Sequence, residues 1–231
     1  MKFSFLALVL LLAFGSKGQE SFQISVPPRT VSGNASAQIY SVEIPTNWSQ
    51  KNFSLFQNGD SGETEVPFQL EGNEVFWKVE NQDLDKFLIY EIKDSAPKPS
   101  YSDLKIKKEN GQLAIYQNET KLLGYQLDLK EAPEGINPIY GRSGFIHPLN
   151  TPSGKRLTRI QPKDHFHHYG IWNPWTHTLY KGDTLDFWNL NKGDGTVKYS
   201  KTIHTISGAI FCEYQVLQEH DQRQHHQEHD Q

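Results

Sequence analysis

Short alternations of apolar and polar residues recur along most of the chain, and they predict strands rather than helices. Residues 38–44 alternate with a period of two, and Pro45 ends the run. Similar runs, rich in β-branched and aromatic residues, lie at 74–79, 87–92, 104–107, 112–116, 121–127, 203–206 and 209–216. No window carries a 3.6-residue apolar stripe long enough for a core helix. We therefore predict an all-β fold, an antiparallel β-sandwich with a small N-terminal β module.

Glycine-containing segments lie between these predicted strands. Residues 58–62 and 191–195 combine Asn, Asp and Gly, a composition typical of tight turns. Gly144 and Gly170 flank a histidine-rich stretch. Because glycine tolerates positive φ and close contact with other backbone, we expect one or both of these features at the two positions.

Proline and serine mark a division within the chain. Residues 95–102 contain two prolines and three serines, a composition that favours an extended linker. We therefore expect an N-terminal β module over residues 19–94 and a β-sandwich core over residues 103–217.

The two ends of the chain differ from the rest. Met1 and Lys2 precede an apolar stretch and then small residues at 16 and 18, which predicts a signal peptide over residues 1–18. We therefore expect a periplasmic or secreted protein with no membrane span after cleavage. Residues 218–231 contain no apolar side chain and repeat the pentapeptide Gln-Glu-His-Asp-Gln, so we predict a disordered tail there.

The cysteine content excludes an intrachain disulfide, and the charge gives no indication of a polyanionic partner. Cys212 is the only cysteine, so no intrachain disulfide can form. The formal net charge is −4, and lysine and arginine are scattered along the chain. This pattern gives no electrostatic reason to expect nucleic acid or an anionic membrane as a partner.

Four of the ten histidines lie within one short stretch, next to an aspartate and ahead of three tryptophans. A histidine beside a carboxylate can serve as an acid–base pair, and exposed tryptophans can stack on a sugar ring. The candidate catalytic residues are His147, Asp164, His165, His167 and His168, with Glu213 as a further carboxylate. The candidate substrate-binding residues are Trp172, Trp175 and Trp188. The structural alternative is that the histidines cap and cross-link a loop and the tryptophans pack in a core.

The same histidines suggest a transition-metal site. If residues 165–169 are extended, His165 and His167 point to one face, and His147 is the candidate third ligand. Three imidazoles with an open position suit zinc, copper or iron. A cupin-like site of this kind would add a glutamate a few residues later, and residues 169–176 contain none.

Two blocks around this stretch carry a family resemblance. Residues 143–158 (Ser-Gly-Phe-Ile-His-Pro-Leu, then Thr-Pro-Ser-Gly-Lys and Leu-Thr) and residues 162–172 resemble the exported bacterial family labelled "methane oxygenase PmoA", a PmoA-like domain of unknown function. The resemblance, centred on residues 100–216, implies a fold similar to the galactose-mutarotase-like supersandwich. It also implies an origin in polysaccharide-degrading bacteria of the Bacteroidetes type. Family members continue through further strands, so we expect this chain to be a shortened member.

Three hypotheses for function follow. The first is a protein that acts on carbohydrate as a hydrolase, lyase or epimerase through its histidines. The second is a non-catalytic sugar-binding or structural module, since no carboxylate pair with the spacing of a glycosidase is readable. The third is a metal-dependent oxygenase or hydrolase, as the family label implies.

Overall fold

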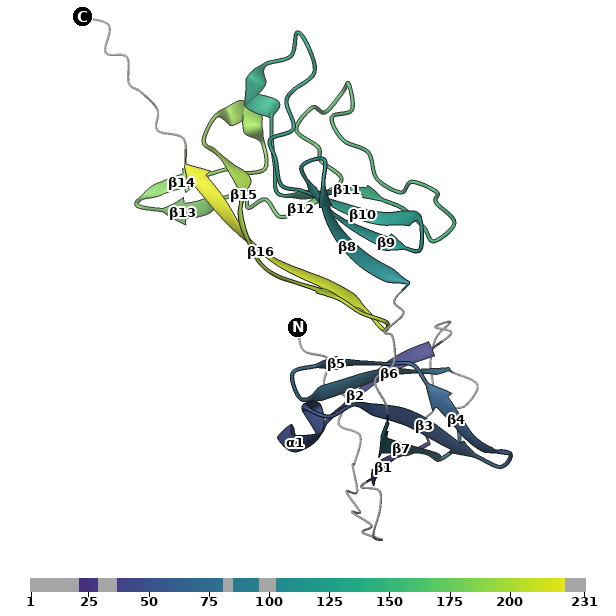
Figure 1. The fold of residues 1–231 in the computed structure, drawn as a ribbon. Coiled ribbons are helices and arrows are strands. Elements are labelled where there is room, and N and C mark those ends of the chain that lie inside the picture. The colour runs from purple at the N-terminus through teal and green to yellow at the C-terminus, as the bar shows by residue number, and fades with distance from the viewer. Residues whose placement is uncertain (1–20, 29–36, 81–84, 96–102, 223–231) are drawn as a thin grey trace, which may run out of the picture. The chain divides into compact units, whose positions relative to one another are not determined.

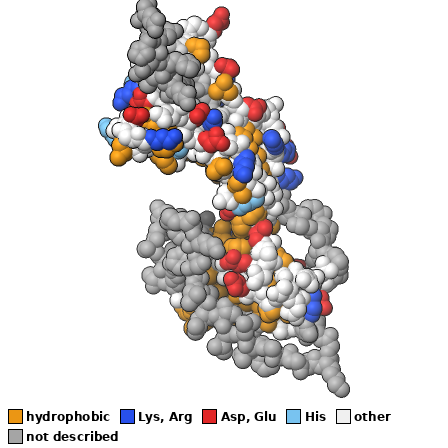
Figure 2. Space-filling model, turned by 90° about the vertical axis from the view of Figure 1, so that its left-hand side faces the viewer, with side chains coloured by type: hydrophobic (Ala, Val, Ile, Leu, Met, Phe, Trp, Pro, Cys, Tyr) orange, Lys and Arg blue, Asp and Glu red, His pale blue; other side chains and the backbone are white. Residues whose placement is uncertain are grey.

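The computed structural model describes residues 21–28, 37–80, 85–95 and 103–222, and its regular secondary structure is almost entirely β-strand (Figure 1). The prediction of an all-β fold with antiparallel sheets is confirmed. The predicted signal peptide and nearly all of the predicted linker fall outside the described residues. On the face drawn in Figure 2, Lys and Arg side chains are mixed with Asp and Glu side chains.

The chain forms two compact units. The first comprises residues 1–102 together with Gly208–Phe211, and the second comprises residues 103–207 and 212–231. Within the first unit, the Gln69 side chain accepts hydrogen bonds from the backbone N–H groups of Ile210 and Phe211. The ring of Phe211 also packs edge-on against Phe76 at 5.0 Å.

The first unit is a sandwich of two antiparallel sheets (Figure 1). Its elements are β1 (Ser21–Val26), β2 (Ala37–Glu43), the one-turn helix α1 (Thr46–Ser49), β3 (Phe53–Gly59), β4 (Gly62–Val66), β5 (Phe68–Glu71), β6 (Glu74–Glu80) and β7 (Leu88–Asp94). One sheet has the order β1-β7-β3-β4, and the other has the order β2-β6-β5.

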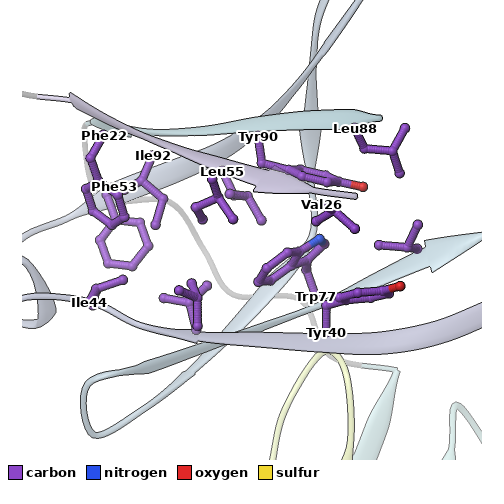
Figure 3. Packing of buried hydrophobic residues seen from close by; sticks show 14 of the residues in the cluster. Phe22, Val26, Tyr40, Ile44, Phe53, Leu55, Trp77, Leu88, Tyr90 and Ile92 are labelled. Atoms are coloured by element: carbon purple, nitrogen blue, oxygen red, sulfur yellow. The ribbon is translucent and has the colours of Figure 1, made fainter. Parts of the chain in front are cut away.

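Alternation along these strands places one row of side chains in the core between the two sheets (Figure 3). Trp77 of β6 is completely buried there, with its ring 5.3 Å from that of Tyr90 on β7 and 6.1 Å from that of Tyr40 on β2. Burial of the aromatic and aliphatic side chains of this core stabilises the unit.

The second unit carries the histidine-rich stretch. Its elements are β8 (Leu104–Glu109), β9 (Gln112–Gln117), β10 (Thr120–Gln126), the 3-10 helix η2 (Pro138–Tyr140), β11 (Phe145–Leu149), β12 (Ile171–Trp172), β13 (Thr178–Tyr180), β14 (Asp183–Leu185), the 3-10 helix η3 (Leu190–Lys192), β15 (Gly195–Ser207) and β16 (Cys212–Gln222). A five-stranded antiparallel sheet has the order β12-β11-β10-β9-β8, while β13–β14 and β15–β16 form two hairpins.

The core of the second unit joins the five-stranded sheet to the long hairpin. Leu113 and Tyr125 of the sheet are buried in one cluster with Tyr199, Tyr214 and Val216 of β15 and β16. The Tyr125 and Tyr214 rings lie 5.1 Å apart. Burial, the largest cause, raises the pKa of Tyr214 to about 12, so this phenol remains protonated at neutral pH.

The predicted disordered tail is wrong for residues 218–222, because β16 continues to Gln222. These residues pair with β15 in register from Gly195↔Gln222 to Tyr199↔Gln218. The Gln218 side chain donates hydrogen bonds to the Tyr125 hydroxyl at 2.8 Å and to the Gly144 carbonyl at 2.7 Å. The last five residues of β16, which lack apolar side chains, are therefore held by the backbone ladder and by a satisfied polar side chain.

Candidate functional site

The histidine-rich stretch is a loop between β11 and β12 that consists of consecutive turns. The N–H of His165 donates to the carbonyl of Pro162 at 2.9 Å, and the N–H of His168 donates to the carbonyl of His165 at 3.0 Å. The extended conformation that would place His165 and His167 on one face is therefore not adopted. Because the chain turns twice, all three histidine rings gather in one place instead of alternating.

Five rings form a continuous cluster, which we call the histidine–tryptophan cluster: His165, His167, His168, Trp172 and Trp188. The His168 ring lies 4.8 Å from that of His165, 4.4 Å from that of His167 and 5.8 Å from that of Trp172. The Trp188 ring lies 5.0 Å from that of Trp172 and 6.2 Å from that of His168. The structure thus brings together three predicted catalytic residues and two of the three predicted substrate-binding tryptophans.

Backbone pairing fixes the position of Trp172 in this cluster. Trp172 on β12 pairs with Phe145 on β11, and the connecting Gly170 has φ = +44°. A Cβ atom at Gly170 would lie 2.1 Å from the Ile146 carbonyl oxygen. Gly144 also has positive φ, at +73°, so the expectation for both glycines is confirmed.

Tyr169 anchors the loop beside this pairing. Its side chain is fully buried against Phe145, with ring centroids 4.7 Å apart. Its hydroxyl donates to the Tyr140 carbonyl and accepts a hydrogen bond from the Gln161 side chain at 2.7 Å. Burial, the largest cause, raises the pKa of Tyr169 to about 12, so the phenol acts here as a neutral structural group.

Asp186 positions Trp188, although it was not among the candidate residues predicted from the sequence. One carboxylate oxygen accepts hydrogen bonds from the backbone N–H groups of Trp188 and Asn189 at 2.9 and 3.0 Å, and the other lies 2.7 Å from the Lys192 ammonium. Burial alone would raise the pKa of Asp186, but Lys192 and the two N–H donors outweigh it and lower the pKa. An aspartate two residues before a turn is the signal that could have revealed this role.

Arg142 lies beneath the cluster and was likewise not selected. Its side chain is 1% exposed, and its Nη2 donates to the Phe187 carbonyl at 2.9 Å. The guanidinium carbon lies 5.9 Å from the ring centroids of both Tyr169 and Trp172. A buried guanidinium of this kind holds the aromatic residues in place and adds positive potential to the cluster.

The histidines and Asp164 differ in their electrostatics. His165 Nδ1 and Asp164 Oδ2 lie 3.0 Å apart on an exposed part of the loop. This hydrogen bond is the largest cause that lowers the pKa of Asp164. Burial, followed by the charges of His168, His165 and Arg142, lowers the pKa of His167. His167 is therefore a neutral imidazole at pH 7, a form that can accept a proton.

His147 does not join the cluster. Its Nδ1 lies 2.9 Å from the Thr158 hydroxyl, and burial, together with the charge of Arg156, lowers its pKa. Among the described residues, no group of three or more His, Cys, Asp or Glu side chains is arranged to hold a metal ion. The predicted metal ligands His147, His165 and His167 are therefore not assembled into a site in this structure.

Trp175 and Glu213 also lie elsewhere. The Trp175 ring stacks on His220 of β16, with centroids 3.8 Å apart and an interplanar angle of 19°. Glu213 lies 3.0 Å from His204 across the β15–β16 hairpin. His220 was missed because it falls in the segment predicted to be disordered.

The fold and site define an all-β protein with an aromatic and histidine-rich surface on its second unit. A family of unknown function, DUF6807, matches residues 112–229, just over half of the 231-residue chain, and the chain belongs to this family. The match bears out the expectation of a domain of unknown function. Comparison with curated proteins and with solved structures gives no match. Within the described ranges, no helix is long and apolar enough to cross a membrane.

Proposed function

We propose that the second unit binds carbohydrate at the histidine–tryptophan cluster. The observation that carries this proposal is Trp188, which is 40% exposed although it packs against Trp172 and His168. A tryptophan that is both exposed and fixed offers a flat apolar surface with little conformational entropy left to lose on binding. The C–H face of a pyranose ring is complementary to such a surface.

Polar groups around Trp188 suit the hydroxyl groups of a sugar. The imidazoles of His167 and His168 and the exposed carboxylate of Asp164 lie in or beside the cluster, and together they offer hydrogen-bond donors and acceptors. Binding sites for small polar ligands commonly combine an apolar surface with a few placed polar groups of this kind. The resemblance of residues 143–172 to PmoA-like proteins implies an origin in polysaccharide-degrading bacteria, and this favours carbohydrate as the ligand.

Direct binding measurements test this proposal. The full-length protein is titrated with defined cello-, xylo-, manno-, galacto- and galacturono-oligosaccharides, and binding is followed by calorimetry. We expect Trp188→Ala to weaken the tightest interaction at least about tenfold, because truncation of a tryptophan that is a binding hot spot costs about 2 kcal/mol or more. Tyr180→Ala removes another exposed ring of the same unit and is the matched control. Unchanged affinity in Trp188→Ala, with its fold intact, would refute the assignment.

The Asp164–His165 pair supports a second candidate function, acid–base chemistry on the bound sugar. The 3.0 Å contact orients the His165 ring, and the neutral imidazole of His167 lies 5.7 Å from it between ring centroids. An oriented imidazole and a neutral imidazole can together move a proton at a ring carbon or at a glycosidic oxygen, and this is the chemistry of lyases, epimerases and hydrolases. In this arrangement His167 would be the base. We expect any turnover found in the same panel to fall at least about a hundredfold in His167→Gln. Turnover at the wild-type rate in this variant would rule out His167 as the base.

Two further expectations from the sequence belong with the proposal. An exported location would place the protein near polysaccharide, and N-terminal sequencing of the mature protein checks cleavage after residue 18. The metal-dependent alternative is checked by elemental analysis of a protein shortened to end at Gln222, which removes three of the four histidines of the C-terminal segment.

A further inference from the structure

Trp175 and His220 form a second aromatic platform, separate from the histidine–tryptophan cluster. The imidazole covers one face of the indole at 3.8 Å, and Trp175 as a whole is still 49% exposed. His220 is held by Phe187, which meets it edge-on at 5.1 Å, and its Nε2 lies 3.3 Å from the Asn173 carbonyl oxygen. The exposed indole is therefore backed by a fixed layer of the protein.

This platform is attached to the same backbone as the cluster. The N–H of Phe187 donates to the Trp175 carbonyl at 2.8 Å, and the next residue in the chain is Trp188. One hydrogen-bonded backbone contact and one peptide unit therefore separate Trp175 from Trp188, and their Cα atoms are at most roughly 10–11 Å apart. The buried Arg142 contacts both the platform and the cluster, because it donates a hydrogen bond to the Phe187 carbonyl and lies beside the Trp172 ring.

We infer that the Trp175–His220 platform is a second subsite for the same ligand, which is accordingly an oligosaccharide that spans at least two sugar rings. This inference rests on the proposed function. Two separate flat surfaces, each the size of one indole, match successive rings of a glycan better than they match the continuous apolar face of a peptide helix. The exposed Asn173 lies between Trp172 and Trp175 in the chain and adds a polar group between the two apolar surfaces.

Chain-length dependence tests the second subsite. The probe is the oligosaccharide series that binds the wild type best in the panel above, titrated from monosaccharide to hexasaccharide. We expect Trp175→Ala to weaken hexasaccharide binding about tenfold and to leave monosaccharide binding within about twofold, since only the longer ligand reaches both platforms. Trp175→Phe keeps a flat ring and should recover most of the loss. His220→Gln removes the ring behind the indole and should give a smaller loss of the same kind.

Leu179→Ala is the matched control, because Leu179 is 75% exposed on the neighbouring hairpin and lies outside both platforms. A loss in Trp175→Ala that is equal for all chain lengths would overturn the second subsite, and so would the absence of any loss. In both cases the Trp188→Ala result decides the proposed function separately. If the wild type binds none of the probes, both proposals fail. Circular dichroism and thermal melting establish that each variant is folded.

Discussion

Substitution of Gly170 by alanine would test how the histidine-rich loop is held against the sheet. The added Cβ atom would lie 2.1 Å from the Ile146 carbonyl oxygen, far inside the contact distance. Because the obstacle is backbone in β11, no side-chain rotation relieves the overlap. Either β12 moves away from β11 or the turn at residue 170 changes its dihedral angles.

The expected loss of unfolding free energy in Gly170→Ala has two contributions. An alanine at φ = +44° costs roughly 1 kcal/mol because its Cβ crowds the following carbonyl. Separation of β12 from β11 would disrupt the pairing of Phe145 with Trp172 and of Ile146 with Ile171, at about 1 kcal/mol for each hydrogen bond lost. We therefore expect Gly170→Ala to destabilise the second unit by about 3 kcal/mol and to displace Trp172.

Gly154→Ala is the matched control. Gly154 also has positive φ, at +84°, but a Cβ atom there would meet nothing within 4 Å. Its substitution should cost about 1 kcal/mol, the conformational contribution alone.

Urea unfolding with amide hydrogen exchange read at β11 and β12 measures both effects. Gly170→Ala should lose protection at Ile146 and Trp172 under conditions in which Gly154→Ala keeps it. If the two variants were equally stable and equally protected, the clash with Ile146 would not exist in solution and the described position of the loop would be wrong.

Three other predictions follow from the packing and charges. Burial lowers the pKa of His147, His167 and His220, so the unfolded state binds protons first as the pH falls below the usual value of 6.5. The melting temperature of the second unit should therefore fall between pH 7 and pH 5, and a pH-independent melting temperature would contradict the burial of these rings. Asp186→Ala removes two backbone hydrogen bonds and an ion pair, and it should cost about 2–3 kcal/mol by urea unfolding; a cost below 1 kcal/mol would refute its positioning role. Trp77→Ala empties the core of the first unit and should cost about 3–5 kcal/mol in the same assay, and a smaller loss would show that this core is loosely packed.

Much of the strand pattern was readable from the sequence because one face of each strand is buried. Residues 38–44 alternate in sequence, and the structure places β2 at Ala37–Glu43 with Tyr40 and Val42 buried. The run at 74–79 likewise became β6, Glu74–Glu80. Alternation of apolar and polar residues predicts such strands well, because burial of one face of a strand requires an apolar residue at every second position.

The site was only partly readable, because its geometry depends on contacts between distant residues. The turn at His165 depends on a hydrogen bond to Pro162, which competes with an extended strand of the same composition. The separation of Trp175 from Trp172 depends on His220, which is remote in the chain. Arg142 was not a candidate since nothing local indicates that its guanidinium is buried.

The extension of β16 to Gln222 has a practical consequence for work with this protein. A fragment that ends at Leu217 would leave Gly195–Tyr199 without its partner strand and would remove His220 from beneath Trp175. An affinity tag or a fluorescent label belongs after residue 222, where it leaves this ladder intact. A dye placed directly after Gln222 would lie beside the last pair of the ladder, Gly195 with Gln222, and its anisotropy would report whether the end of the hairpin is closed.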